Sequence, residues 1–218
     1  MDKINRIEIL NQSDLYPVIS REFNAGRSSL EILDCVLAAG VKIVQLREKN
    51  LPMREKYELA LAFRRKTSEA GVLFIVNDQI DLALAVDADG VHLGQNDFPL
   101  IPARRLAPEL ILGRSTHSTT QALEAERDGA DYVNIGPIYA TGTKPEHQVF
   151  LGPQIIAEIA PRLRIPFTVM GGIKETNLQP VLDAGARHIA VVTAVSQADD
   201  VTRAARCLRE RILAAGRT

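Results

Sequence analysis

The sequence has no tryptophan, only two cysteines and no long apolar run. Cys35 and Cys207 lie far apart in segments with helical apolar spacing, and they show neither metal-ligand spacing nor a redox motif. We expect both to be buried structural thiols, since free cysteine is among the most buried residue types. No run approaches the ~18 apolar residues of a membrane-spanning helix. The start, MDKINRIEIL, carries charges where a signal peptide needs an apolar segment, so we expect a cytoplasmic protein without a membrane partner.

The chain also lacks an excess of charge of either sign. Lys and Arg number 26 against 27 Asp and Glu, which leaves a formal net charge of -1 and gives no reason to expect a nucleic-acid partner. Any anion site must therefore be built locally, from a few placed cations and backbone amides. With 218 residues, of which 46% are hydrophobic, the chain is long enough to bury a core in one domain or in two small ones.

Short apolar runs rich in β-formers alternate with segments of helical spacing. The expected strands are 16–20, 42–48, 73–78, 90–94, 110–116, 132–136, 166–172 and 188–194. Helical spacing is clearest in 28–40, 53–71, 118–130, 176–186 and 201–213. Strict alternation favours parallel strands with helical crossovers, and eight repeats in about 200 residues fit one (β/α)8 TIM barrel of the α/β class. We assign the barrel to residues 14–218 and an N-terminal extension to residues 1–13. A doubly wound open sheet is the alternative, but no GxGxxG follows the first run.

In a barrel, active sites lie at the carboxyl ends of the strands, so polar residues there are candidates for chemistry. The run 42–48 leads into Gln45, Arg47 and Lys49, which strand alternation points the same way. One amide and two cations at the barrel mouth suit a phosphate or diphosphate. The alternative is a solvated basic strand end, with Glu48 paired locally.

Two carboxylates, Asp78 and Asp97, follow neighbouring expected strands. Adjacent strands lie ~4.8 Å apart, so the two side chains are expected to approach one another, and their repulsion would raise a pKa unless a cation lies between them. Mg²⁺ binds one or two carboxylates and fills its shell with water and phosphate oxygens. The alternative is that Asp78 caps a helix beginning near Gln79 and Asp97 occupies a turn before Pro99. The cations of the run 42–48 favour Mg²⁺.

The next two strands carry histidines and a serine. We interpret His92 as a packed, hydrogen-bonded core residue because apolar residues flank it. Ser115 is a candidate donor to a substrate phosphate or ring, and a nucleophilic role is disfavoured because no Asp-His relay is evident. His117 is either an acid-base group or part of the entry to a helix that Ser118 would cap.

The last strand ends carry glycines and hydroxyls. The loop 137–152 is unusually long and contains Thr141, Gly142, Thr143 and Lys144, which favours a substrate-covering loop over a plain solvent loop. After the next strand, Gly171 and Gly172 would let the backbone approach a phosphate. Loops after the seventh and eighth strands frequently form the phosphate site of a barrel. The sequence thus predicts two anion sites at one mouth, one of them assisted by a metal.

The motifs QLREK, ND, VHLGQND, GRSTH, DYVNIGPIYATGTK, MGGI and AVVTA, in this order, resemble the thiamine-phosphate synthase family over residues 14–210. The resemblance implies a barrel enzyme that joins 4-amino-2-methyl-5-(diphosphooxymethyl)pyrimidine to 4-methyl-5-(2-phosphooxyethyl)thiazole, or to its carboxylated form. Pyrophosphate would leave first, with one Mg²⁺ per subunit, and the thiazole nitrogen would capture the pyrimidine carbocation. Two departures are mild: Met170 replaces the usual aliphatic residue, and Thr193 replaces serine but keeps the hydroxyl.

The resemblance also implies a role for each matching residue. The residues implied to contact the pyrimidine diphosphate are Gln45, Leu46, Arg47, Glu48, Lys49, Asn77, Ser115 and Lys144, and those implied to be catalytic are Lys144, Ser115, Arg47 and Lys49. The residues implied to bind the thiazole phosphate are Thr141, Gly142, Thr143, Gly172, Val192 and Thr193, and those implied to hold Mg²⁺ are Asp78 and Asp97. The partners would be phosphorylated small molecules, in a monomer or a homo-oligomer. The alternatives are a thiazole tautomerase that uses His117 and a non-catalytic ligand-binding barrel.

Overall fold

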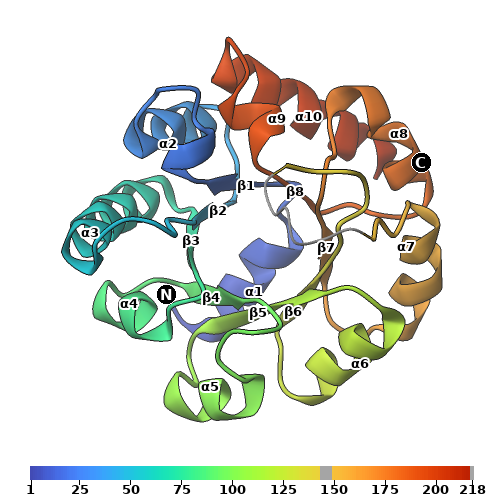
Figure 1. The fold of residues 1–218 in the computed structure, drawn as a ribbon, viewed down its shortest axis with the longest axis horizontal. Coiled ribbons are helices and arrows are strands. Elements are labelled where there is room, and N and C mark those ends of the chain that lie inside the picture. The colour runs from blue at the N-terminus through green and yellow to red at the C-terminus, as the bar shows by residue number, and fades with distance from the viewer. Residues whose placement is uncertain (143–148, 217–218) are drawn as a thin grey trace.

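The computed structural model describes residues 1–142 and 149–216. Within these residues, parallel strands close into a barrel whose strand order follows the chain from β1 to β8 (Figure 1). Closure is direct, because Leu15 in β1 pairs with Ile189 in β8. This confirms the predicted (β/α)8 fold and excludes the doubly wound open sheet. The strands are β1 Leu15–Ile19, β2 Ile43–Leu46, β3 Leu73–Asn77, β4 Gly90–Leu93, β5 Ile111–Thr116, β6 Tyr132–Ile135, β7 Phe167–Val169 and β8 Ile189–Val191.

Helices form the outer ring around the strands, and each expected helical segment contains one (Figure 1). The α-helices of the described residues are α1 Lys3–Asn11, α2 Ser29–Ala38, α3 Met53–Ala70, α4 Ile80–Ala85, α5 Leu100–Leu106, α6 Thr119–Arg127, α7 Gln154–Ile159, α8 Gln179–Asp183, α9 Thr193–Ser196 and α10 Val201–Ala215. Short 3-10 turns are η1 Arg21–Phe23, η2 Ala160–Arg162 and η3 Glu175–Asn177. No helix in this part of the chain is long and apolar enough to cross a membrane.

All strands except β1 are shorter than the apolar runs that predicted them. The run 42–48 yields Ile43–Leu46, and the run 166–172 yields Phe167–Val169. The chain leaves the ladder at each carboxyl end because it must turn outward to reach the next helix. The first residue beyond β2 is still tethered, since the Arg47 backbone N–H donates to the Ile19 carbonyl at 2.8 Å. Arg47 and Asp78 therefore occupy the first positions of loops. Gln45, Asn77 and Ser115 lie in the strands themselves.

Two apolar layers lie on either side of the strands. The larger layer fills the space between strands and helices, where the Phe63 ring of α3 lies 5.7 Å from the Phe74 ring of β3. The smaller layer fills the barrel interior at the amino ends of the strands and includes Ile43 and Leu73, both fully buried. Alternating side chains supply the two layers, as period-2 strands require. The apolar filling leaves only the carboxyl end of the barrel open for polar side chains.

The sequence indicates no function for residues 1–13, and the structure shows that they pack against the barrel. Helix α1 lies across the amino end of the barrel and is seen through the ring of strands (Figure 1). Its Leu10 is 2% exposed and packs into the interior layer, flanked by Ile7 and Ile9. Asp2 caps the helix by accepting a hydrogen bond from the Asn5 N–H at 2.9 Å. The segment thus closes the bottom of the barrel.

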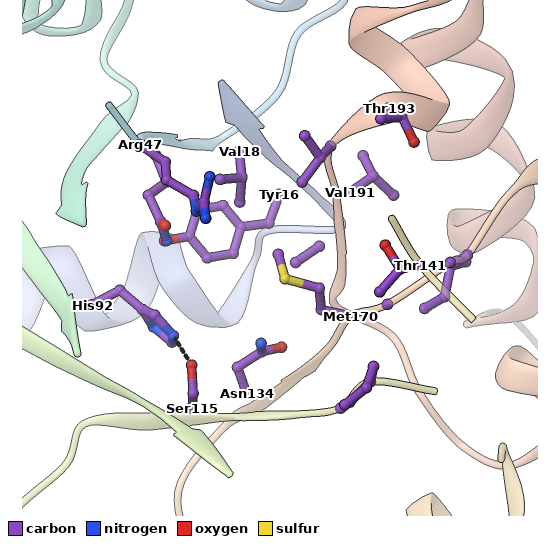
Figure 2. Close-up of a pocket in the computed structure, with 18 of the residues that line it drawn as sticks. Tyr16, Val18, Arg47, His92, Ser115, Asn134, Thr141, Met170, Val191 and Thr193 are labelled. Atoms are coloured by element: carbon purple, nitrogen blue, oxygen red, sulfur yellow. Dashed lines mark hydrogen bonds between the residues drawn. The ribbon is translucent and has the colours of Figure 1, made fainter. Parts of the chain in front are cut away.

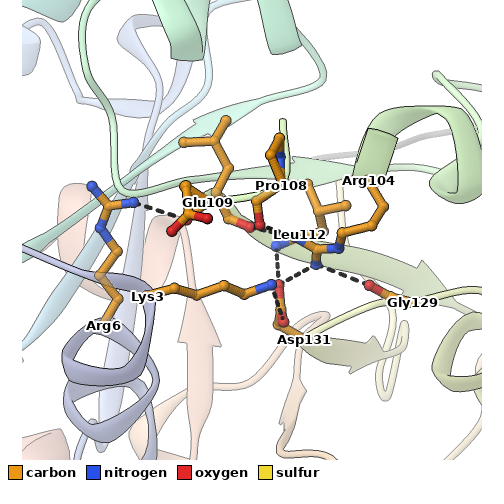
Figure 3. Close-up of polar contacts among 9 residues, drawn as sticks. Lys3, Arg6, Arg104, Pro108, Glu109, Leu112, Gly129 and Asp131 are labelled. Carbon is orange, nitrogen blue, oxygen red and sulfur yellow. Dashed lines mark hydrogen bonds and ion pairs between the residues drawn. The ribbon is translucent and has the colours of Figure 1, made fainter. Parts of the chain in front are cut away.

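Ion pairs fasten this closed end (Figure 3). From α1, Lys3 reaches Asp131 at 3.0 Å and Arg6 reaches Asp89 at 3.1 Å. Asp131 also pairs with Arg104 of α5 and accepts a hydrogen bond from a backbone N–H of β5. Asp89 and Asp131 each precede a strand directly, so each carboxylate anchors a strand start to the helices outside. The amino end of the barrel is a structural rim in which every one of these carboxylates has a cation.

The two cysteines differ from expectation. Cys35 in α2 and Cys207 in α10 are free thiols, as predicted, but both are half-buried rather than fully buried. Amphipathic helices on the outside of a barrel leave their flanks partly in solvent, and both thiols lie on such helices.

Candidate active site

A cavity of about 900 Å³, measured to its open mouth, lies at the carboxyl ends of the strands. Figure 2 shows Arg47, Ser115, Thr141 and Thr193 around it. The predicted site residues that line the cavity are Gln45, Arg47, Asn77, Ser115, Thr141, Gly172, Val192 and Thr193. Thr143 and Lys144 lie outside the described residues.

Arg47 places a buried guanidinium in the lining of the cavity. It is 8% exposed, and its Nε and Nη1 are buried without a hydrogen-bond partner among the described residues. Buried polar groups in native proteins are nearly always paired, so an unpaired guanidinium requires an explanation. A guanidinium presents a planar fork of donors that fits phosphate oxygens bidentately. The Arg47 donors are therefore suited to bind an anionic ligand.

The two predicted metal ligands meet near Lys49, and these three residues lie outside the lining of the cavity. Asp78 forms an ion pair with Lys49 and lies within hydrogen-bonding reach of the Asp97 carboxyl. Burial, followed by the hydrogen bond and the negative charge of Asp78, raises the pKa of Asp97 above its ordinary value. The expected approach of the two carboxylates is confirmed. It leaves two like charges in contact, which a divalent cation would resolve.

The helix-cap alternative for Asp78 fails, whereas the turn alternative for Asp97 holds. Helix α4 begins at Ile80, and its capping residue, Gln79, makes no side-chain cap bond. Asp78 instead adopts φ 64°, a left-handed conformation uncommon for a residue with a side chain. Asp97 does close a turn, because its N–H donates to the Gly94 carbonyl at 3.1 Å and its carboxylate accepts from the Gly94 N–H at 2.6 Å.

Leu46 and Glu48 point away from the cavity. Leu46 is buried in the outer apolar layer. Glu48 accepts hydrogen bonds from the Arg21 N–H and the Ser29 hydroxyl, both at 2.9 Å, and so ties the β1–α2 connection to the end of β2. The Glu48 contacts hold the loop that carries Arg47. This is the local pairing that strand alternation allows for residues 46 and 48.

Lys56 is a cation near the site that the sequence reasoning missed. It lies on α3, is 8% exposed, and donates to Gln79 at 2.7 Å. Burial lowers the pKa of Lys56, while the charges of Asp78 and Glu48 oppose that shift. Its position inside a helical pattern carried no signal, because lysine on a helix ordinarily faces solvent.

A hydrogen-bonded chain crosses the floor of the cavity. Gln45 Nε2 donates to the Tyr16 hydroxyl at 2.7 Å, and the Tyr16 and Tyr132 hydroxyls lie 3.1 Å apart. His92 Nδ1 lies 2.9 Å from the Tyr132 hydroxyl, and His92 Nε2 lies 2.9 Å from Ser115 Oγ (Figure 2). The expectation of a packed, hydrogen-bonded His92 is confirmed. The second nitrogen of His92 lies against a tyrosine hydroxyl, which differs from the Asp-His pairing of a nucleophilic triad.

Asn134 is a second residue that the sequence reasoning missed. It lines the cavity from β6, and its Oδ1 accepts a hydrogen bond from the Thr168 hydroxyl at 2.9 Å. With the oxygen engaged, the amide of Asn134 offers N–H donors to the cavity. The available signal was its inward position, two residues before Gly136 in a strand of alternating faces.

The loop after β6 packs on the glycines after β7. Ile138 and Tyr139 donate backbone hydrogen bonds to residues 170 and 171, each at 2.9 Å. Gly172 has φ 61°, and a Cβ there would lie 2.3 Å from the Ala140 carbonyl oxygen. Glycine is therefore required for the loop to approach, beyond any role toward a phosphate. The same packing brings Thr141 to the cavity, whereas Gly142 is exposed outside its lining.

His117 also lines the cavity. Its Nδ1 lies 2.5 Å from the Gly136 carbonyl oxygen, so that nitrogen carries a proton and donates. The following residue, Ser118, caps α6 as predicted by accepting from the Gln121 N–H at 3.2 Å.

Within residues 1–142 and 149–216, no group of three or more His, Cys, Asp or Glu side chains is arranged to hold a metal ion. The pair Asp78 and Asp97 is the donor set that the sequence predicts, and its two carboxyls lie together. Mg²⁺ usually binds only one or two protein carboxylates when substrate phosphates complete its shell, and this pair matches that number. The residues present fit Mg²⁺ better than zinc, whose closed sites need three or four protein ligands.

Comparisons with known proteins agree over nearly the whole chain. The model of the family described as thiamine monophosphate synthase matches residues 15–195. The thiamine-phosphate synthase of Pelotomaculum thermopropionicum is 45% identical over 92% of both chains. That of Chloroflexus aurantiacus is 48% identical over 89% of this chain and 90% of its own. The solved thiamine phosphate pyrophosphorylase from Pyrococcus furiosus has a TM-score of 0.87 at 38% identity, and covers 94% of this chain and 98% of its own.

Proposed function

The chain belongs to the thiamine monophosphate synthase family, and from this premise we propose how its cavity joins a pyrimidine diphosphate to a thiazole phosphate. The chain is an enzyme of thiamine biosynthesis that forms thiamine phosphate. The observation that carries the proposed chemistry is Arg47, a buried guanidinium with two unpaired donors among the described residues. Such a group is complementary to an anion that arrives with the substrate.

The diphosphate of the pyrimidine substrate is proposed to bind beside Arg47 and Lys49. Arg47 supplies the bidentate donors, and Lys49 supplies a second, more exposed charge at the mouth. Asn77, the last residue of β3, lines the same side of the cavity and offers an amide to the substrate. Leu46 and Glu48 stay in the proposal only through their backbone, because their side chains are engaged elsewhere.

Asp78 and Asp97 are proposed to hold one Mg²⁺ per chain. The raised pKa of Asp97 reflects burial beside a second carboxyl, which is the electrostatic condition that a divalent cation relieves. When bound, Mg²⁺ would neutralise charge on the diphosphate oxygens. Lys49 balances Asp78 in the free protein.

The thiazole phosphate is proposed to bind at the opposite wall. Gly172, Val192 and Thr193 line that wall, and Thr193 begins α9 with a hydroxyl and a backbone N–H. The first N–H groups of a helix have no intrahelical partner, so they remain available to an acceptor. Thr141 and Gly142, with Thr143 beyond the described residues, are proposed to cover the thiazole ring.

The proposed reaction needs no nucleophile and no strong base from the protein. The bond between the pyrimidine methylene and the diphosphate oxygen breaks, and the thiazole nitrogen bonds to that methylene. Arg47, Lys49 and Lys144 are proposed to stabilise the negative charge that grows on the departing pyrophosphate. Ser115 is proposed to donate to the pyrimidine substrate. Apolar residues such as Val18 and Met170 line the cavity and exclude water from the carbocation.

One assay tests the function. The purified chain is incubated with both substrates and Mg²⁺, and thiamine phosphate and pyrophosphate are measured. Equal amounts of the two products support the proposal. Interconversion of thiazole isomers without thiamine phosphate would favour a tautomerase, since His117 lines the cavity with Nδ1 held by a carbonyl. Ligand binding with no turnover of either kind would indicate a non-catalytic barrel.

The remaining assignments are proposals as well. We assign catalysis to residues 14–218, with residues 1–13 as the extension that carries α1. Because the substrates are phosphorylated metabolites, the site of action is proposed to be the cytoplasm. Homo-oligomer formation stays a prediction, and gel filtration with light scattering tests it.

A further inference from the structure

The hydrogen-bonded chain on the cavity floor links two opposite walls of the site. It runs from Gln45 in β2 through Tyr16 in β1, Tyr132 in β6 and His92 in β4 to Ser115 in β5. Each of the five side chains is 6% exposed or less. Buried polar groups are nearly always hydrogen-bonded, so the hydrogens of this chain are shared among its members or directed to the cavity.

The hydrogens along this chain can be counted from the Gln45 end. Gln45 Nε2 donates to the Tyr16 hydroxyl oxygen, and either tyrosine hydroxyl can donate to the other; in the polarity argued below, Tyr16 gives its hydrogen to Tyr132. Tyr132 then accepts from Tyr16 and donates its own hydrogen to His92 Nδ1. Burial raises the pKa of both tyrosines, so each hydroxyl keeps its single hydrogen.

The count continues through the imidazole. A neutral imidazole that accepts at Nδ1 carries its proton on Nε2, so His92 donates to Ser115 Oγ. The Ser115 hydroxyl hydrogen is therefore directed away from His92, toward the cavity that Ser115 lines. At the other end, Gln45 lines the cavity with its amide nitrogen engaged by Tyr16, so the amide oxygen is the group we assign as acceptor toward a ligand.

We propose that Tyr16, Tyr132 and His92 are positioning residues that fix Gln45 as a hydrogen-bond acceptor and Ser115 as a donor toward the substrate ring. The two roles are coupled, because reversing Gln45 would reverse every bond along the chain and turn Ser115 into an acceptor. The site selects a heteroaromatic ring that presents an amino group to one wall and a ring nitrogen to the other. An aminopyrimidine carries both groups. The inference rests on the proposed function for the identity of the ring, but not for the polarity of the chain.

The polarity is tested by ¹⁵N NMR of the full chain labelled at histidine, without ligand. The signal of His92 is assigned by its loss in His92→Gln. We expect a neutral ring with the proton on Nε2. A proton on Nδ1, or on both nitrogens, would overturn the proposed roles of Gln45 and Ser115. A purely structural role for His92 predicts no particular tautomer.

The consequence for recognition is tested by Tyr132→Phe, which keeps the ring and breaks the chain at its centre. Two unreactive inhibitors are compared: 4-amino-5-hydroxymethyl-2-methylpyrimidine and the same alcohol without the amino group. We expect the ratio of their inhibition constants to fall about tenfold in Tyr132→Phe, the value of one oriented hydrogen bond. The KM for thiazole phosphate should stay unchanged. An unchanged inhibitor ratio would overturn the proposal.

Thr67→Val is the matched control, because Thr67 is fully buried on α3 and its hydroxyl donates to the Phe63 carbonyl at 2.9 Å, outside the barrel interior. It should lower stability and leave the inhibitor ratio unchanged, and an equal fall in both variants would contradict the positioning role. If Tyr132→Phe fails to fold, Tyr16→Phe breaks the chain one link earlier with the same readout. A wild-type chain that makes no thiamine phosphate refutes the proposed function, whereas the NMR result stands independently of turnover.

Discussion

Replacing Arg47 by methionine should make the free protein more stable while it removes activity. The substitution keeps an unbranched apolar stem in place of the arginine stem and deletes a charge that is 8% exposed. It also deletes two buried donors that have no partner among the described residues. A donor left unsatisfied costs ~1–3 kcal/mol. Removing both should raise the free energy of unfolding by about 2 kcal/mol, after allowance for imperfect packing of the methionine.

Thermal unfolding gives the first measurement. For a chain of this size, about 1 kcal/mol shifts Tm by ~2–4 °C, so Arg47→Met should melt about 4–8 °C above the wild type in the absence of ligands. Arg54→Met is the control, because the Arg54 side chain is 90% exposed and its removal changes net charge equally. The control should shift Tm by less than about 2 °C, since exposed substitutions stay within ±0.5 kcal/mol.

Ligand binding and turnover give the opposite sign. Pyrophosphate with Mg²⁺ at about 100 times its Kd should stabilise the wild type by ~2.7 kcal/mol, and Arg47→Met should lose most of that gain. Two charge-assisted hydrogen bonds are worth ~3–6 kcal/mol together, so kcat/KM should fall about 10²–10⁴-fold. A variant that melts below the wild type without ligand would refute the reasoning, because it would mean that the Arg47 donors are satisfied inside the protein.

Three further substitutions test other parts of the molecule. Because the folded-state pKa of Asp97 is raised, the metal-free folded protein holds that proton more tightly than the unfolded chain. Urea unfolding in EDTA should therefore show stability that declines as pH rises from about 4 through the raised pKa, and Asp97→Asn should remove this decline. Leu10→Ala should cost ~2–5 kcal/mol by opening a cavity under the barrel, measured by urea unfolding against Ile4→Ala, which is 74% exposed and should cost almost nothing. Gly172→Ala should displace the Ala140 carbonyl and raise the KM for thiazole phosphate more than that for the pyrimidine diphosphate, measured by steady-state kinetics.

The barrel could be predicted because its signals are local and repeated. Apolar runs of strand length alternate with helical segments, and glycines end several helices. Gly40, Gly71, Gly129 and Gly185 each follow a helical run, where a left-handed cap favours glycine, and all four have positive φ. Strand ends were overestimated, because apolar residues continue into the loops that pack against the helices. An apolar pattern indicates which residues are buried, and residues beyond the last hydrogen-bonded position of a strand can be buried as well.

The mouth of the site could be predicted in part. Alternation along β2 correctly turned Gln45 and Arg47 to the cavity, and the same alternation accounts for the outward Leu46 and Glu48. The approach of Asp78 to Asp97 followed from neighbouring strand ends. These inferences need only the period of a strand and the topology of the barrel.

The floor chain could not be predicted, because its contacts span the whole barrel. Tyr16 and Tyr132 lie 116 positions apart and meet only because β1 and β6 face the same interior. Both tyrosines lie near the amino ends of their strands, so the rule that found Arg47 at a carboxyl end passed over them. The packing of helix α1 could not be predicted for a related reason. Its exposed Ile4 and buried Leu10 give no clear apolar face until the docking site is known.

The two ends of the barrel use the same charged residue types under opposite conditions. At the amino end, Asp89 and Asp131 each have cationic partners on the helices that surround them. At the carboxyl end, Arg47 keeps unpaired donors and Asp97 lies against a second carboxyl. Removing either carboxylate at the first end deprives two partly buried cations of their shared partner, so stability falls. Removing Arg47 at the second end deletes two buried donors that have no partner among the described residues, so stability should rise while binding is lost. The sign of the stability change therefore separates a structural charge from a functional one in this fold.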